Sequence, residues 1–269
     1  MAVKLAFVKK PKILLALDDS WVMIKRSSTH IIRNMDQLLG TFFQPIMFMV
    51  LFASVFSGAV AGALPPGVSY IEFLMAGIIV QTVAFGSTTT AVAVTYDMQK
   101  GIMDRFRSLP MMNLAVLNGH VISDLLRNSI SIVVMIITGL IMGVRPVAGP
   151  IEWLAIVGIL LLFTLAFSWL AAIVGLVAKS VEAVQWISFV LIFPLTFASS
   201  AFAPTQNMTP WLKAFVENQP ITQIIEAVRA LMLGMPLGSY GWKAVAWSIG
   251  ILVVSLPVAS WLFRRKTAV

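Results

Sequence analysis

Long apolar stretches separated by short charged segments dominate this chain of 269 residues, and they restrict it to one class of fold. Hydrophobic residues make up 59% of the sequence and charged residues only 11%. A soluble domain needs far more polar surface than this, whereas a membrane-spanning helix needs about 20 consecutive apolar residues. The sequence therefore predicts an all-α integral membrane protein. We expect six spans, at about residues 38–64, 73–95, 120–143, 153–178, 184–203 and 243–263.

The positions of Lys and Arg predict how these spans are oriented. Basic residues accumulate on the cytoplasmic side of a membrane. With six spans, fifteen of the 19 basic residues fall on one side, and the other side holds only Arg145, Lys213, Arg229 and Lys243. We therefore expect both termini in the cytoplasm, in a multi-pass protein of the plasma (inner) membrane. Trp153, Trp211 and Trp242 then lie near the outer interface, where indole rings are favoured.

Several classes of chemistry are not expected from this sequence. There is no cysteine, so disulfides, thiol nucleophiles and Cys-based metal sites are excluded. His30 and His120 have no partners at metal-ligand spacing, so we expect no metal site. The net charge of +8 could suggest nucleic acid in a soluble protein, but here the charges flank the spans, so no nucleic-acid partner is expected. Residues 13–17 are apolar but too short for a signal peptide.

The first 37 residues are predicted to form a cytoplasmic N-terminus with an interfacial helix. Over residues 20–37, apolar side chains that include Trp21 recur along one helical face, while Lys25, Arg26 and Arg33 lie elsewhere on the wheel. A basic amphipathic helix of this kind lies in the membrane interface. We treat residues 1–269 as a single permease domain, with the six-span bundle at 38–263 and a cytoplasmic tail at 264–269.

A compact polar segment, residues 97–110, interrupts the apolar pattern between the second and third spans. Ile102, Phe106 and Leu109 recur at helical spacing and form one stripe. Gly101 can turn the chain into this helix and Pro110 ends it. A helix of about two turns is unstable alone, so we expect it to lie along the inner membrane face and present its polar side to a soluble partner. The alternative is a loop whose charges only fix the topology.

The outer segment at residues 204–241 is predicted to contain two short helices. Thr209 and Pro210 begin the first, and the second runs from about Pro220 to Gly234. In the second helix, Glu226 and Arg229 are expected to pair on the polar side. The two helices suggest a re-entrant hairpin in the outer leaflet, or alternatively an amphipathic pair on the outer surface.

The polar segment resembles the cytoplasmic-loop signature of type-2 ABC transporter permeases. The run from Gly101 to Pro110, followed by Asp124-Leu-Leu-Arg127-Asn128, is most similar to the daunorubicin/doxorubicin-resistance-type drug-efflux branch. Residues 197–204, 218–222 and 227–231 also match that branch. In this family the loop is a coupling helix that sits in a groove of the ATP-hydrolysing subunit. The resemblance assigns that contact to Gly101, Ile102, Asp104, Arg105, Phe106, Arg107, Ser108, Leu109 and Pro110, and a further contact to the interfacial helix.

The resemblance implies that energy comes from another chain. We find no phosphate-binding loop, because the nearest string, 175–180, lacks the second glycine. This chain is therefore expected to be a permease and not an enzyme, with no cofactor of its own and with ATP and Mg on a separate ATPase subunit, present in two copies. A second permease, identical or a sister chain, is also expected. Candidate residues for a substrate path between the permeases are Gln44, Gln81, Thr88, Thr89, Phe189 and Phe193.

The function implied is export of a hydrophobic or amphipathic compound, such as a drug, an antibiotic or a lipid-like molecule. Export of a lipid-linked glycan is an alternative within the family, and a non-transporting assembly or sensor subunit is another. An ion-coupled secondary transporter would need ionisable residues near the middle of the bilayer. The acidic residues within the predicted spans and beside them, in contrast, are all expected near span ends: Glu72, Asp97, Asp124, Glu152 and Glu182. Asp124 and Arg127 are expected to pair near the inner face.

Overall fold

The computed structural model of the chain describes residues 35–100 and 115–267, and every regular element in that part is a helix. The predicted coupling helix and residues 20–34 of the predicted interfacial helix therefore lie outside the described residues, whereas residues 35–37 belong to α2. The elements are α2 (Met35–Val60), η1 (Ala61–Ala63), α3 (Tyr70–Gly86), α4 (Thr88–Gln99), α6 (Ala115–Ile141), α7 (Pro150–Val177), α8 (Val181–Phe197), η2 (Thr205–Asn207), α9 (Pro210–Asn218), α10 (Pro220–Leu233) and α11 (Tyr240–Thr267).

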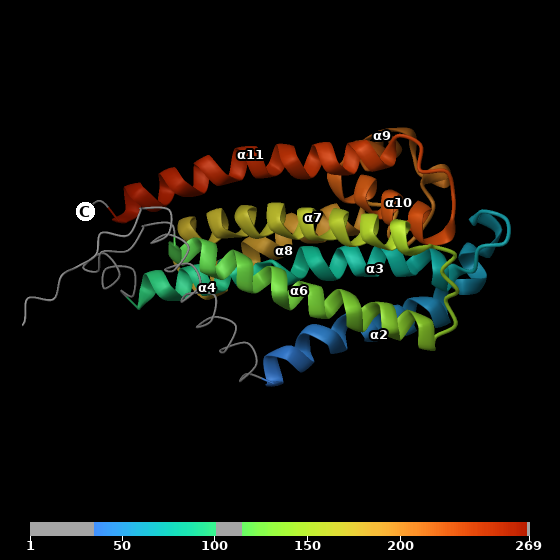
Figure 1. Cartoon of the computed structure of the whole chain (residues 1–269), viewed down its shortest axis with the longest axis horizontal. Helices are drawn as coiled ribbons and strands as arrows, with labels where there is room; N and C mark the ends of the chain where they lie inside the picture. The colour runs from blue at the N-terminus through green and yellow to red at the C-terminus, as the bar shows by residue number, and fades with distance from the viewer. Residues whose placement is uncertain (1–34, 101–114, 268–269) are drawn as a thin grey trace, which may run out of the picture.

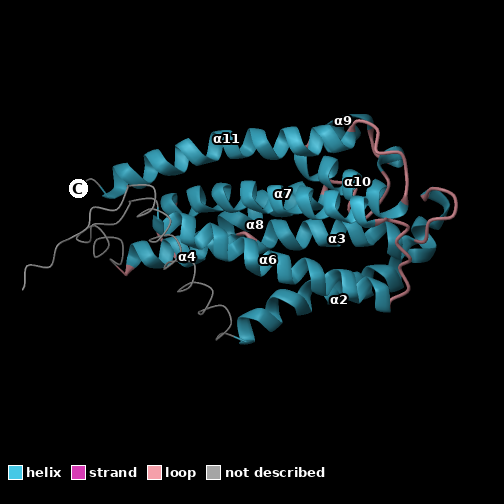
Figure 2. Ribbon diagram, viewed as in Figure 1, coloured by secondary structure: helices cyan, strands magenta, loops and turns pink. Residues whose placement is uncertain are grey.

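The helices form an elongated bundle, with the long helices running along its length (Figures 1 and 2). The short helices α9 and α10 lie together at one end, which we call the hairpin end. At the opposite end α4 stops, α6 begins and α11 finishes, and we call this the C-terminal end. Short connections between consecutive long helices make neighbours antiparallel, as is usual in helical bundles.

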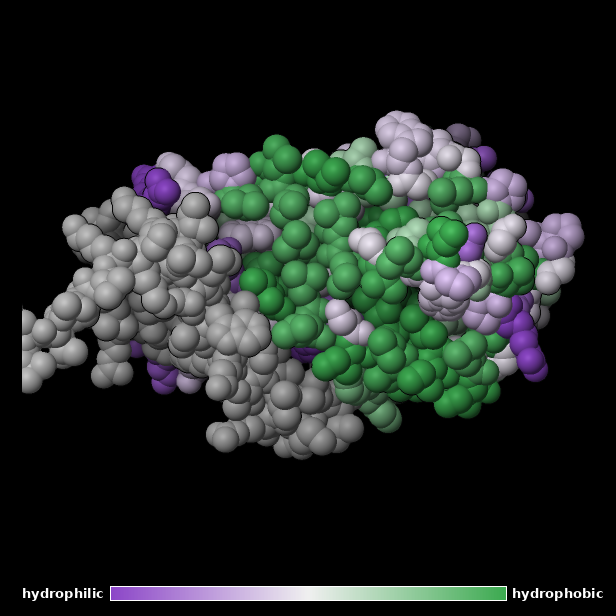
Figure 3. Space-filling model, viewed as in Figure 1, coloured by the Kyte–Doolittle hydropathy of each residue, from purple (hydrophilic) through white to green (hydrophobic). Residues whose placement is uncertain are grey.

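The surface and the helix lengths fit a membrane protein. In the face shown in Figure 3, apolar residues form a broad band across the middle of the bundle, and hydrophilic residues gather toward its ends. In the described part, five helical stretches are long and apolar enough to cross a bilayer: Phe42–Ala63, Tyr70–Gln99, Val116–Ile141, Pro150–Val177 and Tyr240–Lys266. The remaining predicted span corresponds to α8, which is apolar but has only 17 residues. It ends at Phe197, earlier than the predicted 203.

Within the second predicted span, one residue, Ser87, separates α3 from α4, and its backbone stays in the helical region. The chain passes from α3 to α4 through Ser87, whose hydroxyl donates to the carbonyl of Ala84 at 2.7 Å. The hydroxyl of Thr89 donates to the carbonyl of Gly86 at 2.9 Å. Ser and Thr side chains that bond to nearby carbonyls compete with the regular helical ladder. The run of Ser and Thr after Gly86 therefore accounts for the interruption.

The apolar interior is divided into two clusters along the bundle. The hairpin-end core is built by α2, α3, α10 and the adjoining halves of α6 and α7, with Leu74, Ile78, Met135, Phe163 and Ile224 among its fully buried members. The C-terminal core is built by α4, α6, α7 and α11, with Val94, Leu117, Trp169, Leu176 and Phe263 among its members. Close packing of these side chains supplies van der Waals contacts that hold the helices together.

Glycines allow the closest approaches between elements. A Cβ placed on Gly175 of α7 would lie 2.5 Å from the carbonyl oxygen of Ala91 in α4. A Cβ on Gly77 of α3 would lie 2.5 Å from the carbonyl oxygen of Ala201, in the turn after α8. Small residues at such contacts let backbones approach and are typical of helix packing in membranes.

Replacement of Gly175 by alanine should destabilise the protein by about 1–3 kcal/mol, because the added methyl group forces α4 and α7 apart. Gly158 in the same helix is the matched control, because a Cβ there would meet no atom within 4 Å. Gly158→Ala should leave stability unchanged or raise it slightly, since alanine is the better helix former. Thermal unfolding in detergent measures both, and equal effects of the two variants would contradict this packing.

Candidate functional site

The two helices that bracket residues 101–114 are tied together by a side-chain pair. Nε2 of His120, in α6, lies 2.9 Å from a carboxylate oxygen of Asp97, in the last turn of α4. Both side chains are largely buried, with 14% and 7% exposure. The sequence predicted a satisfied histidine but not its partner, because Asp97 comes from another helix and only the fold brings the two together. Among the described residues, no three His, Asp or Glu side chains gather as a metal site would require.

The end of α4 is also fixed to α7. The hydroxyl of Thr95 donates to the carbonyl of Gly175 at 2.8 Å, and the side-chain amide of Gln99 donates to the carbonyl of Lys179 at 3.0 Å. Together with the Asp97–His120 pair, these bonds join α4, α6 and the end of α7 beside the predicted coupling segment. A displacement of that segment would therefore be passed to three helices at once.

A cluster of polar groups lies deeper in the bundle, at the break between α3 and α4. We call it the polar layer, and it consists of Gly86, Thr89, Asp124, Arg127, Asn128 and Ser168.

Arg127 is central to the polar layer. It forms an ion pair with Asp124 and donates through Nη2 to the carbonyl of Gly86 at 3.0 Å. Asp124 also accepts hydrogen bonds from Ser168 of α7 and, at 3.4 Å, from Thr89 of α4. The predicted pairing of Asp124 with Arg127 is confirmed.

The predicted position of Asp124 near a span end was wrong. Helix α6 extends back to Ala115, so Asp124 lies more than two turns inside it and is only 2% exposed. The predicted span began at about His120, five residues later than the helix does. The acidic side chain is tolerated at this depth because Arg127, Ser168 and Thr89 surround it with donors.

The candidate residues for a substrate path do not form one continuous surface in this chain. Gln44 is exposed on α2, whereas Gln81 of α3 is buried and its amide nitrogen has no partner. Thr88 and Thr89 lie at the α3–α4 break, beside the polar layer. Phe189 and Phe193 are exposed on α8, at 46% and 38%.

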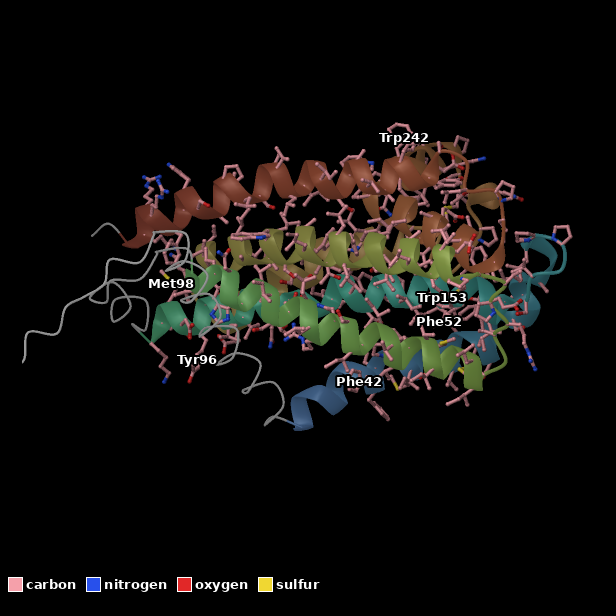
Figure 4. The ribbon with its side chains drawn as sticks, viewed as in Figure 1. Phe42, Phe52, Tyr96, Met98, Trp153 and Trp242 are labelled. Atoms are coloured by element: carbon pink, nitrogen blue, oxygen red, sulfur yellow. The ribbon has the colours of Figure 1, made fainter. Side chains whose placement is uncertain are left out.

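Phe189 and Phe193 belong to a longer series of aromatic contacts, which we call the aromatic row. Neighbouring ring centroids lie 4.1–5.2 Å apart from Phe189 to Phe56, and Trp186 adds an edge contact at 6.5 Å. In order, its members are Trp186, Phe189, Phe193, Phe197, Phe202, Phe52 and Phe56. Figure 4 labels Phe52, where the row has crossed to α2.

Only part of the aromatic row could be found from the sequence. Phe189, Phe193 and Phe197 recur every four residues and so share one face of α8. The continuation through Phe202 to Phe52 joins segments about 150 residues apart, and no local spacing indicates it.

Arg229 anchors the helical hairpin to the bundle. Its guanidinium donates to the carbonyl of Phe73 through Nε at 3.1 Å and Nη2 at 3.0 Å, and to the carbonyl of Ser200 at 2.7 Å. It also lies 3.6 Å from the centroid of the Phe73 ring and forms an ion pair with Glu226. The predicted Glu226–Arg229 pair is confirmed.

The expectation that this pair lies on an exposed polar side was wrong for Arg229, which is 2% exposed. Helix α10 packs against α3, α7 and α11, so nearly all of its faces are covered. The side-chain amide of Gln219 holds the start of this helix, because it donates to the carbonyls of Leu195 and Ala198 at 2.9 and 3.1 Å.

The two ends of the bundle differ in composition. Trp153 and Trp242 lie toward the hairpin end, and Tyr96 and Met98 lie toward the C-terminal end (Figure 4). The last turn of α11 carries Arg264, Arg265 and Lys266 at the C-terminal end. This distribution agrees with indoles at one interface and basic residues at the other.

Comparison with known proteins assigns the family. The model of the ABC-2 type transporter family matches residues 19–233, which include both helices tied by Asp97 and His120 and the whole polar layer. The chain belongs to the ABC-2 transporter membrane family. As a family member it is a multi-pass membrane subunit of a transporter, and the family implies partnership with an ABC ATPase subunit.

Relatives in this family carry drug-resistance names. The daunorubicin resistance ABC transporter permease protein DrrB1 of Streptomyces coeruleorubidus is 31% identical over 86% of this chain and 81% of its own length. The probable doxorubicin resistance ABC transporter permease protein DrrC of Mycobacterium tuberculosis is 26% identical over 87% of this chain and 84% of its own length. The putative transport permease ycf38 of Porphyra purpurea is 24% identical over 77% and 71%. The resemblance drawn from the polar segment is therefore confirmed.

Replacement of Arg229 by methionine should destabilise the protein by about 3–5 kcal/mol, because Glu226 and two carbonyl oxygens lose their partner. Lys213→Met in α9 is the matched control, since Lys213 forms only an exposed pair with Glu217 at 3.8 Å. The control should change stability by less than about 0.5 kcal/mol. Urea or thermal unfolding in detergent compares the two variants, and a small loss for Arg229→Met would contradict the anchoring role.

Proposed function

We propose that this chain is the transmembrane subunit of an ATP-driven exporter that moves a hydrophobic or amphipathic compound out of the cell. The observation that carries the proposal is the connection between α4, α6 and α7 beside residues 101–114. Asp97 and His120 join the two helices that flank this segment, and Thr95 joins α4 to α7. A soluble subunit that pushes or pulls the segment would thus move three transmembrane helices together.

The partner that supplies the energy is a separate ABC ATPase, in two copies, which binds ATP and Mg. We assign its contact surface to residues 101–110, which include the charged residues Asp104, Arg105 and Arg107. The interfacial helix at residues 20–37, with Lys25, Arg26 and Arg33, adds a second contact. The membrane family of this chain supports both assignments.

In the proposed orientation, the C-terminal end of the bundle faces the cytoplasm and the hairpin end faces outward, in the plasma membrane. The basic residues at the end of α11 support this orientation. Helix α8 is the fifth of the six spans in chain order. Its 17 residues reach about 25 Å, which is the lower limit for a spanning helix. The burial of α10 among α3, α7 and α11 supports a re-entrant hairpin and not a surface pair.

The substrate path is proposed to lie between two permeases, along α2 and α8. Helix α2 leaves most of its length uncovered within the chain, and a Cβ on Gly58 or Gly62 would meet no atom within 4 Å. The aromatic row crosses the same region, with Phe189, Phe193 and Phe56 between 38% and 46% exposed. Stacked rings of this kind bind flat apolar groups. The names of the relatives, which refer to daunorubicin and doxorubicin, agree with such a substrate.

An ion-coupled mechanism is less well supported by the polar layer. A proton-carrying carboxylate would need to change its protonation state during transport. Asp124 is the most deeply placed acidic residue of the second and third spans, and it already pairs with Arg127 and accepts from Ser168. Its carboxylate oxygens are thus already held by partners from α4, α6 and α7.

The double variant Arg105→Ala with Arg107→Ala should insert normally and lower ATP-dependent transport, because two cationic contacts to the ATPase subunit are lost. Arg265→Ala with Lys266→Ala is the matched control, since it removes two basic residues from the same side of the membrane. Transport in cells with equal protein levels measures the effect. If both double variants transport as the unmodified chain does, residues 105 and 107 only set the topology.

Removal of one ring from the aromatic row, by Phe193→Ala, should raise the KM for transport of a flat aromatic compound about three- to tenfold, as expected for one lost stacking contact. Val190→Ala is the matched control, because Val190 is 61% exposed on the same helix and lies outside the row. Dose-dependent uptake into inverted vesicles gives the KM of each variant. An unchanged KM for Phe193→Ala would exclude this ring from the path.

A further inference from the structure

Four spans, with α3 and α4 counted as one, pass from one apolar core to the other along their length. In α3 and α4, the hairpin-end core reaches Ala84 and the C-terminal core begins at Val94. In α6 the change falls between Val121 and Ile132, and in α7 it falls between Phe167 and Trp169. In α11, Ala244 belongs to the first core and Ala259 to the second. The described part of the chain thus consists of two apolar bodies placed end to end. We call them the hairpin-end body, around the first core, and the C-terminal body, around the second.

The polar layer fills the gap between these bodies. The residues of α6 at this level are Asp124, Arg127, Asn128 and Ser131, all buried, and the residue of α7 is the buried Ser168. The junction of α3 and α4 occurs at the same level, where the carbonyl of Gly86 accepts from Arg127. Figure 1 shows α4 continuing the line of α3 beside α6 and α7. Polar contacts between close-packed bodies can be exchanged more readily than interlocked side chains.

Some buried hydrogen-bonding atoms of the polar layer, and of the residues on either side of Thr89, have no partner in the described part of the chain. They are the hydroxyl oxygens of Thr88 and Thr90, Nε of Arg127 and Oδ1 of Asn128. Buried polar groups are nearly always satisfied in a final arrangement. These atoms would form hydrogen bonds in a second conformation of the polar layer. The donor Nε and the acceptor Oδ1 come from adjacent positions of α6, and the two hydroxyls come from the first turn of α4.

We propose that the polar layer is an internal hinge of the transport cycle, and that Arg127 is the positioning residue that holds it in the state seen here. The inference rests on the proposed function. Arg127 connects the carbonyl of Gly86, which also accepts from Thr89, to Asp124 and through Asp124 to Ser168 of α7. When Arg127 exchanges its contacts with Gly86 and Asp124 for others, the C-terminal body tilts relative to the hairpin-end body. The predicted coupling segment connects α4 and α6 of the C-terminal body in the chain. Transport therefore needs motion within each permease and not only between two permeases.

Spin-label distances test the hinge directly, because the native chain contains no cysteine. The pair Tyr96→Cys with Val177→Cys reports on the C-terminal body, and Ile141→Cys with Ile151→Cys reports on the hairpin-end body. The pair Tyr96→Cys with Ile151→Cys reports across the polar layer. These four positions are 50–81% exposed, so labels fit there. The complex with its ATPase is labelled, diluted with unlabelled chains, and measured without nucleotide and with ATP and vanadate.

We expect the distance across the polar layer to change with nucleotide while both distances within a body stay the same. An unchanged distance across the layer, or equal changes in all three pairs, would overturn the inference. The same preparation is assayed for ATP-dependent transport. Failure to transport in the unmodified complex would count against the proposed function, whereas transport without the hinge signature counts against the hinge alone.

Substitutions at Arg127 test its positioning role. Asp124→Asn with Arg127→Gln removes both charges, so no buried charge is left unpaired and folding is preserved. Arg127→Lys keeps the charge but cannot bridge two acceptors as a guanidinium does. The matched control is Ser129→Ala in the same helix, whose hydroxyl bonds only to the carbonyl of Leu125.

We expect both Arg127 variants to keep at least half of the ATP hydrolysis and to lower transport per ATP by about tenfold, as for loss of one buried charged contact. The distance across the layer should also broaden before nucleotide is added. The Ser129→Ala control should match the unmodified complex. Normal transport per ATP in the charge-free double variant, with a narrow distance distribution, would overturn the role of Arg127.

Discussion

The structure depends on a buried ion pair in an apolar bundle. A lone charge at this depth would cost several kcal/mol, so Asp124 and Arg127 can lie inside α6 only because neighbouring elements supply partners. Ser168 comes from α7, Thr89 comes from α4, and the carbonyl of Gly86 is available because the second span is interrupted there. The break in one helix and the charges in another thus explain each other. The fold is arranged so that four helices meet these groups at one level, with a separate apolar core on each side.

The proposed function follows from the segments that connect to each apolar core. The C-terminal core includes α4 and α6, which bracket the predicted contact with the ATPase, and Asp97 and His120 keep these two helices together. The hairpin-end core includes α10, which Arg229 fastens to α3 and to the turn after α8. The aromatic row lies along α8 and α2, and its members Phe52 and Phe202 pack against the hairpin-end core. In the proposed exporter, the ATPase therefore acts on the C-terminal end, and the substrate leaves at the hairpin end. The aromatic row is the surface that the substrate contacts.

The sequence predicted the elements with a strong local signal and missed those that depend on distant partners. The long apolar spans, the start of α10 at Pro220 and the pairs Asp124–Arg127 and Glu226–Arg229 follow from composition and helical spacing. The His120–Asp97 pair, the burial of Arg229 and the passage of the aromatic row to Phe52 involve helices far apart in the chain. The division of the second span at Ser87 was missed because its Ser and Thr run was treated as polar lining and not as a competitor for backbone carbonyls.

The central claim, that this chain works as an ATP-driven exporter subunit, is tested most directly by reconstitution. The chain and its co-purified ATPase are placed in vesicles with a fluorescent, flat and hydrophobic compound, and accumulation is followed with ATP or with an imposed proton gradient. The account predicts accumulation that requires ATP and the ATPase subunit and continues when the gradient is collapsed. Accumulation by the chain alone that requires the proton gradient and ignores ATP would contradict it.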